Sequence, residues 1–381
     1  MTSPVSRRSL FRLTGAGAAG LTGASSLLSQ DKQAGQQPKP VLKLAPEVPF
    51  TVPNGKRSTV SLVRGEDRRK TVYEALMGID AELRPALKRK KYVLIKPNLT
   101  APLIQIADTH PDAVLGILDY LAPRFKGPVI VAESAAFDTM VCFDNWKYHE
   151  IVSEAKSQRV SLLDLNLEER YVPMSIVDYN VHSEPIRIAA RLLDPDAFVI
   201  CAAVPKTHVM AVMTASVKNM AVGCTLRSGP KGTQWSDKGK VHGGFRMKGS
   251  PGDSGSHQMN YNLMLVAEKM APNWGATVLD GHEGMEAEGP VEGVAVPSRV
   301  AIASMDYIAA DRVAVEVMGM NPAWVGYLQY LERAGVGNYD IGKIDVRGEA
   351  IAAVRKTYKP ASTLARAIEW SLPLAQATSK A

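Results

Sequence analysis

Residues 196–208 read Asp-Ala-Phe-Val-Ile-Cys-Ala-Ala-Val-Pro-Lys-Thr-His. The first nine form an apolar run of the kind that makes a strand buried on both faces of a sheet. Pro205 ends the run, and Lys206 and His208 then emerge at its carboxyl end. Ligands of open α/β sheets usually bind at this edge. The segment therefore predicts a buried strand with a functional site at its end.

The rest of the chain alternates apolar strands with helical patterns. We expect strands at 58–63, 91–98, 127–134, 160–165, 198–204, 276–279 and 299–303, and helices at 68–79, 112–121, 211–222, 259–270 and 311–318. This alternation predicts an α/β fold with a mostly parallel sheet, or sheets, and helices on both faces. One arrangement has two lobes that meet near residues 170–195. Residues 227–257 interrupt the pattern as an irregular loop, and residues 351–381 form a C-terminal tail that is either an amphipathic helix or loose.

The N-terminus has the layout of an export signal. Arg7 and Arg8 precede an uncharged stretch at 13–28 that is rich in glycine and alanine. This pattern predicts a twin-arginine signal peptide at 1–30, followed by a linker at 31–57. The stretch is too weakly apolar for a membrane anchor. We expect the twin-arginine translocase to export the chain to the periplasm or beyond the cell.

Composition and missing motifs narrow the function. The chain has 381 residues, a formal net charge of +7 and three cysteines without a Cys-x-x-Cys pair. We therefore expect neither an iron–sulfur cluster nor a structural zinc site. The mild positive charge suits small anions and does not call for nucleic acid. The chain after the signal lacks a Gly-x-Ser-x-Gly elbow, a P-loop and a Gly-x-Gly-x-x-Gly turn, which argues against the commonest hydrolases, NTPases and dinucleotide enzymes.

A first group of candidate residues is basic. Lys206 and His208 share one face of an extended segment, and a helix starting near Met210 would align Thr214 with Lys218. Two ammonium groups and an imidazole would then converge on a carboxylate or phosphate. The alternative is structural: Lys218 reaches solvent, and His208 satisfies a backbone carbonyl.

A second group has the ligand types that suit a divalent metal. Asp280, His282 and Glu283 follow a predicted strand on a loop that is rich in glycine. His208 or His242 is a further candidate donor. No metal motif of fixed spacing accompanies them, so the cofactor is not identified by the sequence.

Other acidic residues favour structural roles. Glu286 and Glu288 are as well explained by an acidic, solvated loop as by binding. Asp306 precedes a predicted helix, where we expect it to act as the N-cap or as a first-turn carboxylate.

Taken together, the motifs resemble domain-of-unknown-function family 362, DUF362. They are Lys96-Pro-Asn-Leu-Thr100, Glu133-Ser134, Val204-Pro-Lys-Thr-His208, Val217-Lys-Asn219, Asp280-Gly281, Glu286-Ala-Glu-Gly-Pro290 and Ser304-x-Asp306 with Asp311. The resemblance covers roughly residues 58–350, which we take as one family domain. It implies a shared polar pocket formed by Lys96, Asn98, Glu133, Lys206, His208, Lys218, Asn219, Asp280 and Glu288. Many family members carry a ferredoxin-like cluster domain, whose cysteines this chain lacks.

The sequence thus favours an exported enzyme that binds a small anionic substrate, either unassisted or with a metal, although no motif fixes the reaction class. The alternatives are a non-catalytic periplasmic anion-binding protein and a metal carrier. The assigned roles are catalytic for Lys206, His208 and Lys218, substrate-binding for Lys96, Asn98, Glu133 and Asn219, and metal-binding for His208, Asp280 and Glu283.

Overall fold

The computed structural model describes residues 56–372 apart from 169, 179, 228–235 and 244–254. These residues belong to one compact unit, Leu42–Ala381. The expected signal peptide at 1–30 lies outside the described residues, as does all but the end of the linker at 31–57. Within the described part of the chain, no helix is both long and apolar enough to cross a bilayer.

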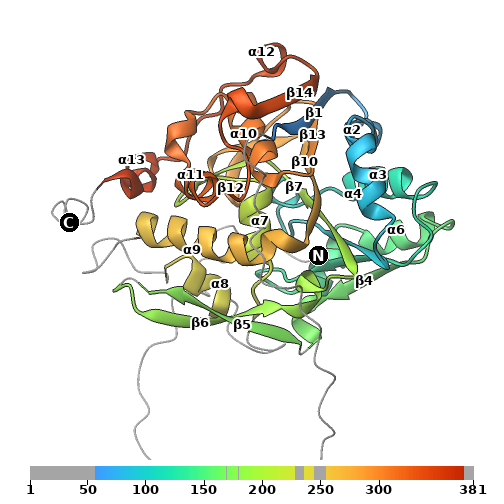
Figure 1. Ribbon diagram of the computed structural model, residues 1–381, viewed down its shortest axis with the longest axis horizontal. Helices are drawn as coiled ribbons and strands as arrows, with labels where there is room; N and C mark the ends of the chain where they lie inside the picture. The colour runs from blue at the N-terminus through green and yellow to red at the C-terminus, as the bar shows by residue number, and fades with distance from the viewer. Residues whose placement is uncertain (1–55, 169, 179, 228–235, 244–254, 373–381) are drawn as a thin grey trace, which may run out of the picture. The chain divides into compact units, whose positions relative to one another are not determined.

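An eight-stranded sheet forms the centre of this unit (Figure 1). β13 is antiparallel to both of its neighbours, β1 and β10, whereas the other neighbouring strands pair in parallel. The expected mostly parallel sheet is therefore confirmed. The strand order is β14 (Ile344–Gly348), β1 (Ser58–Arg64), β13 (Val300–Ser304), β10 (Trp274–Gly281), β7 (Ala197–Ala203), β2 (Tyr92–Lys96), β3 (Val129–Glu133) and β4 (Val160–Asp164).

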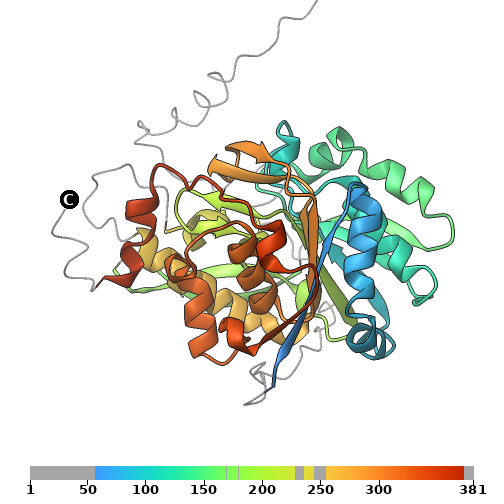
Figure 2. The ribbon, with the colours of Figure 1, turned by 90° about the horizontal axis from the view of Figure 1, so that it is seen from above.

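Helices cover both faces of the sheet, as the sequence predicts (Figure 2). One face packs against α2 (Arg68–Met77), α3 (Asp80–Leu87), α4 (Pro111–Leu121), α5 (Thr139–Asn145) and α6 (Tyr148–Glu154). The other packs against α7 (Ser216–Gly223), α9 (Gly255–Met270), α10 (Tyr307–Val317) and α11 (Gly326–Arg333). The remaining helical elements are the short turns η1 (Gln105–Ala107), η2 (Leu165–Leu167), η3 (Ala190–Leu193), η4 (Ala271–Asn273), η5 (Pro322–Trp324), η6 (Ile341–Lys343) and η7 (Glu369–Ser371), with α8, α12 and α13 described below.

The apolar run at 196–204 explains why two helical layers are needed. It forms β7, which lies between β10 and β2. Val199 belongs to the core beneath α7 and α9, while Phe198 and Ile200 belong to the core on the opposite face. Since successive side chains of a strand point to opposite faces, an uninterrupted apolar run must be covered on both.

Two small sheets account for the main differences from the expected elements. One has the order β12 (Glu292–Val296), β11 (Gly284–Glu288), β8 (Lys206–His208) and β9 (Val212–Thr214), and the other pairs β5 (Tyr171–Val177) with β6 (Ser183–Ala189). The prediction of a loop after Asp280 is therefore wrong for the residues that form β11. The helix expected from residue 211 is wrong at its start, because α7 begins only at Ser216.

A contact from a distant helix sets the start of α7. The Asp311 carboxylate, on α10, accepts hydrogen bonds from the Ser216 and Val217 amides at 2.9 and 3.0 Å. Free amides of a helix N-terminus need such acceptors. Because the acceptor is 95 positions away, spacing within 211–222 does not reveal where the helix begins.

The segments expected to be irregular are partly ordered. Helix α8 (Ser236–Val241) lies within 227–257, and the tail contains α12 (Ile351–Val354) and α13 (Leu364–Ala367). Glu286 accepts a hydrogen bond from the Lys359 amide, and Glu288 accepts one from the Ser362 amide, both at 2.8 Å. These two glutamates therefore hold the C-terminal segment against β11, a role that the solvated-loop interpretation missed.

Asp306 is the expected N-cap, of α10. One carboxylate oxygen accepts from the Ile308 and Ala309 amides, each at 3.0 Å. The other accepts from the Ser58 hydroxyl at 2.6 Å and from the Asn338 amide at 2.9 Å. The residue therefore joins α10, β1 and the segment before η6.

We predict that Asp306→Ala lowers the free energy of unfolding by about 3 kcal/mol, because it removes a cap and leaves buried donors without an acceptor. The matched control is Asp138→Ala, at the exposed N-cap of α5, where the expected loss is about 1 kcal/mol. Urea denaturation of both variants measures the difference. Equal losses would show that the contacts of Asp306 beyond the cap contribute nothing.

Candidate functional site

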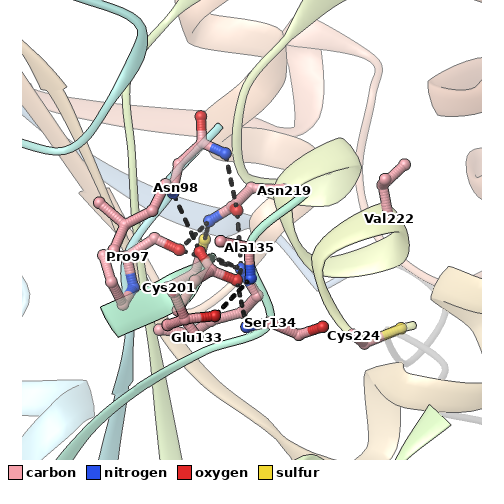
Figure 3. A network of polar contacts seen from close by, with 12 residues as sticks. Pro97, Asn98, Glu133, Ser134, Ala135, Cys201, Asn219, Val222 and Cys224 are labelled. Atoms are coloured by element: carbon pink, nitrogen blue, oxygen red, sulfur yellow. Dashed lines mark hydrogen bonds and ion pairs between the residues drawn. The ribbon is translucent and has the colours of Figure 1, made fainter. Parts of the chain in front are cut away.

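Two strand ends and one helix meet in a buried polar network (Figure 3). Lys96 at the end of β2 contacts both oxygens of Glu133, at the end of β3, at 2.8 and 3.0 Å. Its ammonium also donates to the Asn219 side-chain oxygen, on α7, at 2.9 Å and to the Pro97 carbonyl at 2.9 Å. Lys96 has no exposed surface. A buried charge persists only when it is paired and hydrogen-bonded, and this network meets both conditions.

The network extends into the turns after β2 and β3. The Leu99 and Ser134 amides donate to Glu133 at 3.0 and 2.7 Å, and the Asn98 side chain donates to Asn219 at 3.2 Å. A Cβ at Gly223, the last residue of α7, would lie 2.3 Å from the Lys96 nitrogen. Glycine at this position therefore allows α7 to approach the buried ammonium closely.

Lys206 occupies an adjoining set of acceptors. Its ammonium donates to the Asn98 side-chain oxygen at 2.8 Å, the Ala107 carbonyl at 2.5 Å and the Thr100 hydroxyl at 3.3 Å. An ammonium has three donors, so this one has none to spare. The nearby Asp108 carboxylate and Lys206 attract each other, but burial still raises the pKa of the acid and lowers the pKa of the amine. Lys206 thus holds the turn after β2 in place.

Lys218 lies on α7 next to Asn219 but has different surroundings. Its ammonium contacts the His242 Nε2 atom at 3.3 Å, and His242 Nδ1 lies 2.6 Å from the Lys238 carbonyl. A carbonyl can only accept, so Nδ1 carries the proton and Nε2 presents a lone pair to Lys218. Lys238 donates from its own ammonium to the Val222 and Thr225 carbonyls at 3.0 and 2.7 Å.

His208 completes what we call the basic cluster: Lys218, Lys238, His208 and His242. The rings of His208 and His242 stack with centroids 6.0 Å apart. His208 Nδ1 accepts from the Met210 and Ala211 amides at 3.0 and 3.2 Å, so the opposite ring nitrogen carries its proton.

Burial and mutual repulsion set the protonation of this cluster. Burial, together with the charges of Lys206 and Lys238, lowers the pKa of Lys218 to about 7. Burial lowers the pKa of Lys238 to about 8 and that of His242 to about 3, and places the pKa of His208 well below its usual range. Both imidazoles are therefore neutral at neutral pH, and Lys218 is divided between amine and ammonium.

Ion pairing and exposure separate Lys218 from Lys96, and exposure separates it from Lys206. Lys218 makes no ion pair with any carboxylate of the described residues, whereas Lys96 is paired with Glu133. It also keeps 5% of its surface exposed and His242 keeps 7%, while Lys96 and Lys206 keep none. Of these three lysines, Lys218 is therefore the one that keeps exposed surface.

The acidic group at the end of β10 lies against arginines. Asp280 and Glu283 both pair with Arg68, at 3.1 and 3.0 Å, and His282 contacts Arg299. Burial and the two arginines lower the pKa of His282. Within the described residues no group of three or more His, Cys, Asp or Glu side chains is arranged to hold a metal ion. The structure places His208 with His242, in the basic cluster, and the metal role of Asp280 and Glu283 stays a prediction.

Sequence reasoning missed several residues of these groups. Lys238 lies on α8, in a segment without an apolar period, and Asp108 follows a short 3-10 turn. In the sequence, nothing distinguishes Arg68 and Arg299 from ordinary surface arginines. The sequence offers one signal for these four residues, namely that buried charged side chains need partners. This signal does not identify which residues the partners are.

A family model described as "Domain of unknown function (DUF362)" matches residues 93–316. None of the curated proteins matches the chain. Among solved structures, the crystal structure of a protein from Thermotoga maritima matches with 14% sequence identity and a TM-score of 0.37. The match covers 72% of this chain and 59% of that one, so the chain spans less than two thirds of its structural neighbour.

The two lysines differ in what their removal does to stability. We predict that Lys206→Met lowers the free energy of unfolding by about 3–5 kcal/mol, because it leaves Asp108 and three acceptors buried without their cation. Lys218→Met leaves no carboxylate without its cation, so we expect the free energy of unfolding to be unchanged or higher. Urea denaturation at pH 7 compares the two. A larger loss for Lys218→Met would mean that Lys218 has a structural role.

Proposed function

The chain belongs to the DUF362 family, whose model spans more than half of its residues, and from this premise we propose that it is an enzyme that binds a small anionic substrate at the basic cluster. The substrate is a carboxylate or a phosphate. The binding groups are the ammonium of Lys218 and the charge of Lys238, and Lys218 also transfers protons. The family carries no activity of its own to transfer, so the proposal depends on the site.

The observation that supports this proposal most directly is the uncompensated charge of Lys218. Protein interiors rarely keep a lysine without a carboxylate partner, because desolvation disfavours its ammonium. Here the only contact of that ammonium among the described residues is a neutral imidazole nitrogen. An anionic ligand would supply the missing counter-charge and accept hydrogen bonds from the remaining N–H groups of Lys218.

Proton transfer follows from the same arrangement. A general acid or base works best when its pKa lies near the operating pH, and burial brings the pKa of Lys218 to about 7. His242 Nε2 lies 3.3 Å from the Lys218 nitrogen and holds a lone pair. His242 thereby holds the Lys218 side chain, and a proton can move between Lys218 and a bound substrate without any change in the backbone.

Anion binding should depend on pH in one direction. The groups facing Lys218 are Lys206 and His208 from β8, Lys238 from α8, and His242. Both imidazoles are already neutral above pH 6, so the first of the lysine charges lost as pH rises is that of Lys218, followed by those of Lys238 and Lys206. We predict that the affinity for acetate, whose own charge is constant in this range, falls as pH rises through about 7 when it is measured by calorimetry.

The matched variants for this measurement are Lys218→Met and Lys88→Met. Loss of a buried charge that contacts the ligand should weaken binding by roughly tenfold or more, while removal of the exposed Lys88 should leave it unchanged. Affinity that is the same in both variants, or that does not change with pH, would refute binding at the basic cluster.

Catalysis is tested separately from binding. A panel of small carboxylates and phosphate monoesters is incubated with the protein, and substrate and product are followed by nuclear magnetic resonance. We expect wild type to convert at least one compound and Lys218→Met to convert none, because the variant has lost its acid–base group. Binding without conversion of any bound compound would make the chain an anion-binding protein.

We also propose that the twin-arginine translocase exports the chain, on the evidence of residues 1–30. The double variant Arg7→Lys with Arg8→Lys should keep the protein inside the cell, because the receptor reads the paired arginines. Arg12→Lys, nearby but outside the pair, is the control and should not affect export. Cell fractionation distinguishes these outcomes, and export of the double variant would exclude the route.

A further inference from the structure

Lys218 has the surroundings of a nucleophile as well as those of an acid–base group. We infer that its side-chain nitrogen forms a Schiff base with the carbonyl group of a substrate that also carries a carboxylate. This inference rests on the proposed function, since it assigns the same site to one class of anion, the 2-oxo acids. It adds a covalent step, which anion binding alone does not require.

The contacts single out Lys218 among the four buried lysines around α7. Lys96 and Lys206 have no exposed surface, and each is surrounded by three or more acceptors that hold its protons. Lys238 donates to two backbone carbonyls, which favour its charged form. Lys218 contacts only the His242 lone pair among the described residues and keeps some exposed surface. It is therefore the buried lysine that most readily presents a free amine.

The neighbouring charges favour the neutral amine further. An amine must lose its proton before it attacks, and burial beside other cations lowers the free energy needed for that loss. Lys206 and Lys238 supply these cations, and both imidazoles of the cluster stay neutral. Burial thus supplies neutral amine at neutral pH, where an exposed lysine is almost wholly protonated.

The step balances with groups that are present. The Lys218 nitrogen forms a bond to the carbonyl carbon while the carbon–oxygen π bond breaks, which gives a carbinolamine. The nitrogen releases a proton to solvent, and the former carbonyl oxygen takes up a proton from solvent. One more proton from solvent lets that oxygen leave as water. The product is a protonated imine, and no oxidant or reductant is consumed.

The carboxylate is inferred from charge balance. Protonated imine formation keeps one positive charge at the Lys218 position, with Lys238 close by and no carboxylate of the described residues paired to Lys218. A carboxylate on the substrate neutralises this excess from within the site. A ketone without an anionic group would leave the charge uncompensated, so it should react less.

The test is trapping of the imine in the full-length protein. Wild type is incubated with pyruvate or with acetone, each imine is reduced with borohydride, and the modified residue is located by peptide mass spectrometry. We expect pyruvate to label Lys218 selectively, and roughly tenfold or more beyond acetone, because only pyruvate supplies the counter-charge. Lys218→Arg is the matched variant, since it keeps the cation and removes the nucleophile.

Calorimetry of pyruvate binding without borohydride separates this inference from the proposed function. Selective labelling of wild type, with binding but no labelling at this position in Lys218→Arg, supports both. Binding of pyruvate without labelling of Lys218 overturns the Schiff base and leaves the anion site standing. Labelling of Lys218 by acetone to the same extent as by pyruvate overturns the inference that the substrate carries a carboxylate. If pyruvate neither binds nor labels Lys218, both the Schiff base and the proposed function are overturned. The wild-type peptide map remains decisive even if the variant fails to fold.

Discussion

The arrangement of the site depends on the ion pair between Lys96 and Glu133. Both residues end strands of the central sheet, and both are almost completely buried. A charge in that position needs its partner and its hydrogen bonds, so the turns after β2 and β3 and the face of α7 must come close enough to provide them. Asn219 joins the helix to this pair, and Gly223 allows the approach. Once α7 is fixed in this way, the position of Lys218 follows, one residue before Asn219.

The four lysines around α7 show that the same side chain can take opposite roles. Lys96 and Lys206 have their donors satisfied, and their charges strengthen the framework. Lys218 has one contact among the described residues, with an imidazole nitrogen, and Lys238 has two with backbone carbonyls. Stability alone does not favour a buried, unpaired ammonium, since an apolar side chain of similar size would be at least as good there. Such local conflicts between burial and charge are typical of functional sites.

The sequence predicts the framework well because the deciding interactions are local. The run at 196–204 is apolar throughout, so it had to be covered on both faces, and polar residues after successive parallel strands had to gather at one edge. Asp306 caps its helix as expected, since the acceptor and amides are neighbours in the chain. The predicted start of α7 was wrong because Asp311, which accepts hydrogen bonds from the first amides of this helix, lies on another helix. The pairing of Glu286 and Glu288 with residues 359 and 362 is equally non-local.

The division of labour among the candidate residues could not be read from the sequence for a related reason. Lys206 and Lys218 look equivalent as basic residues near a strand end, and only a count of acceptors around each nitrogen separates them. That count depends on Asn98, Thr100 and the Ala107 carbonyl, which reach Lys206 through a turn whose path no periodicity describes. It also depends on α8, which brings Lys238 and His242 to Lys218 from a segment without an apolar pattern. The fold can thus be inferred from where apolar residues recur, whereas the lysine that we propose as the reactive one is distinguished by the partners it lacks among the described residues.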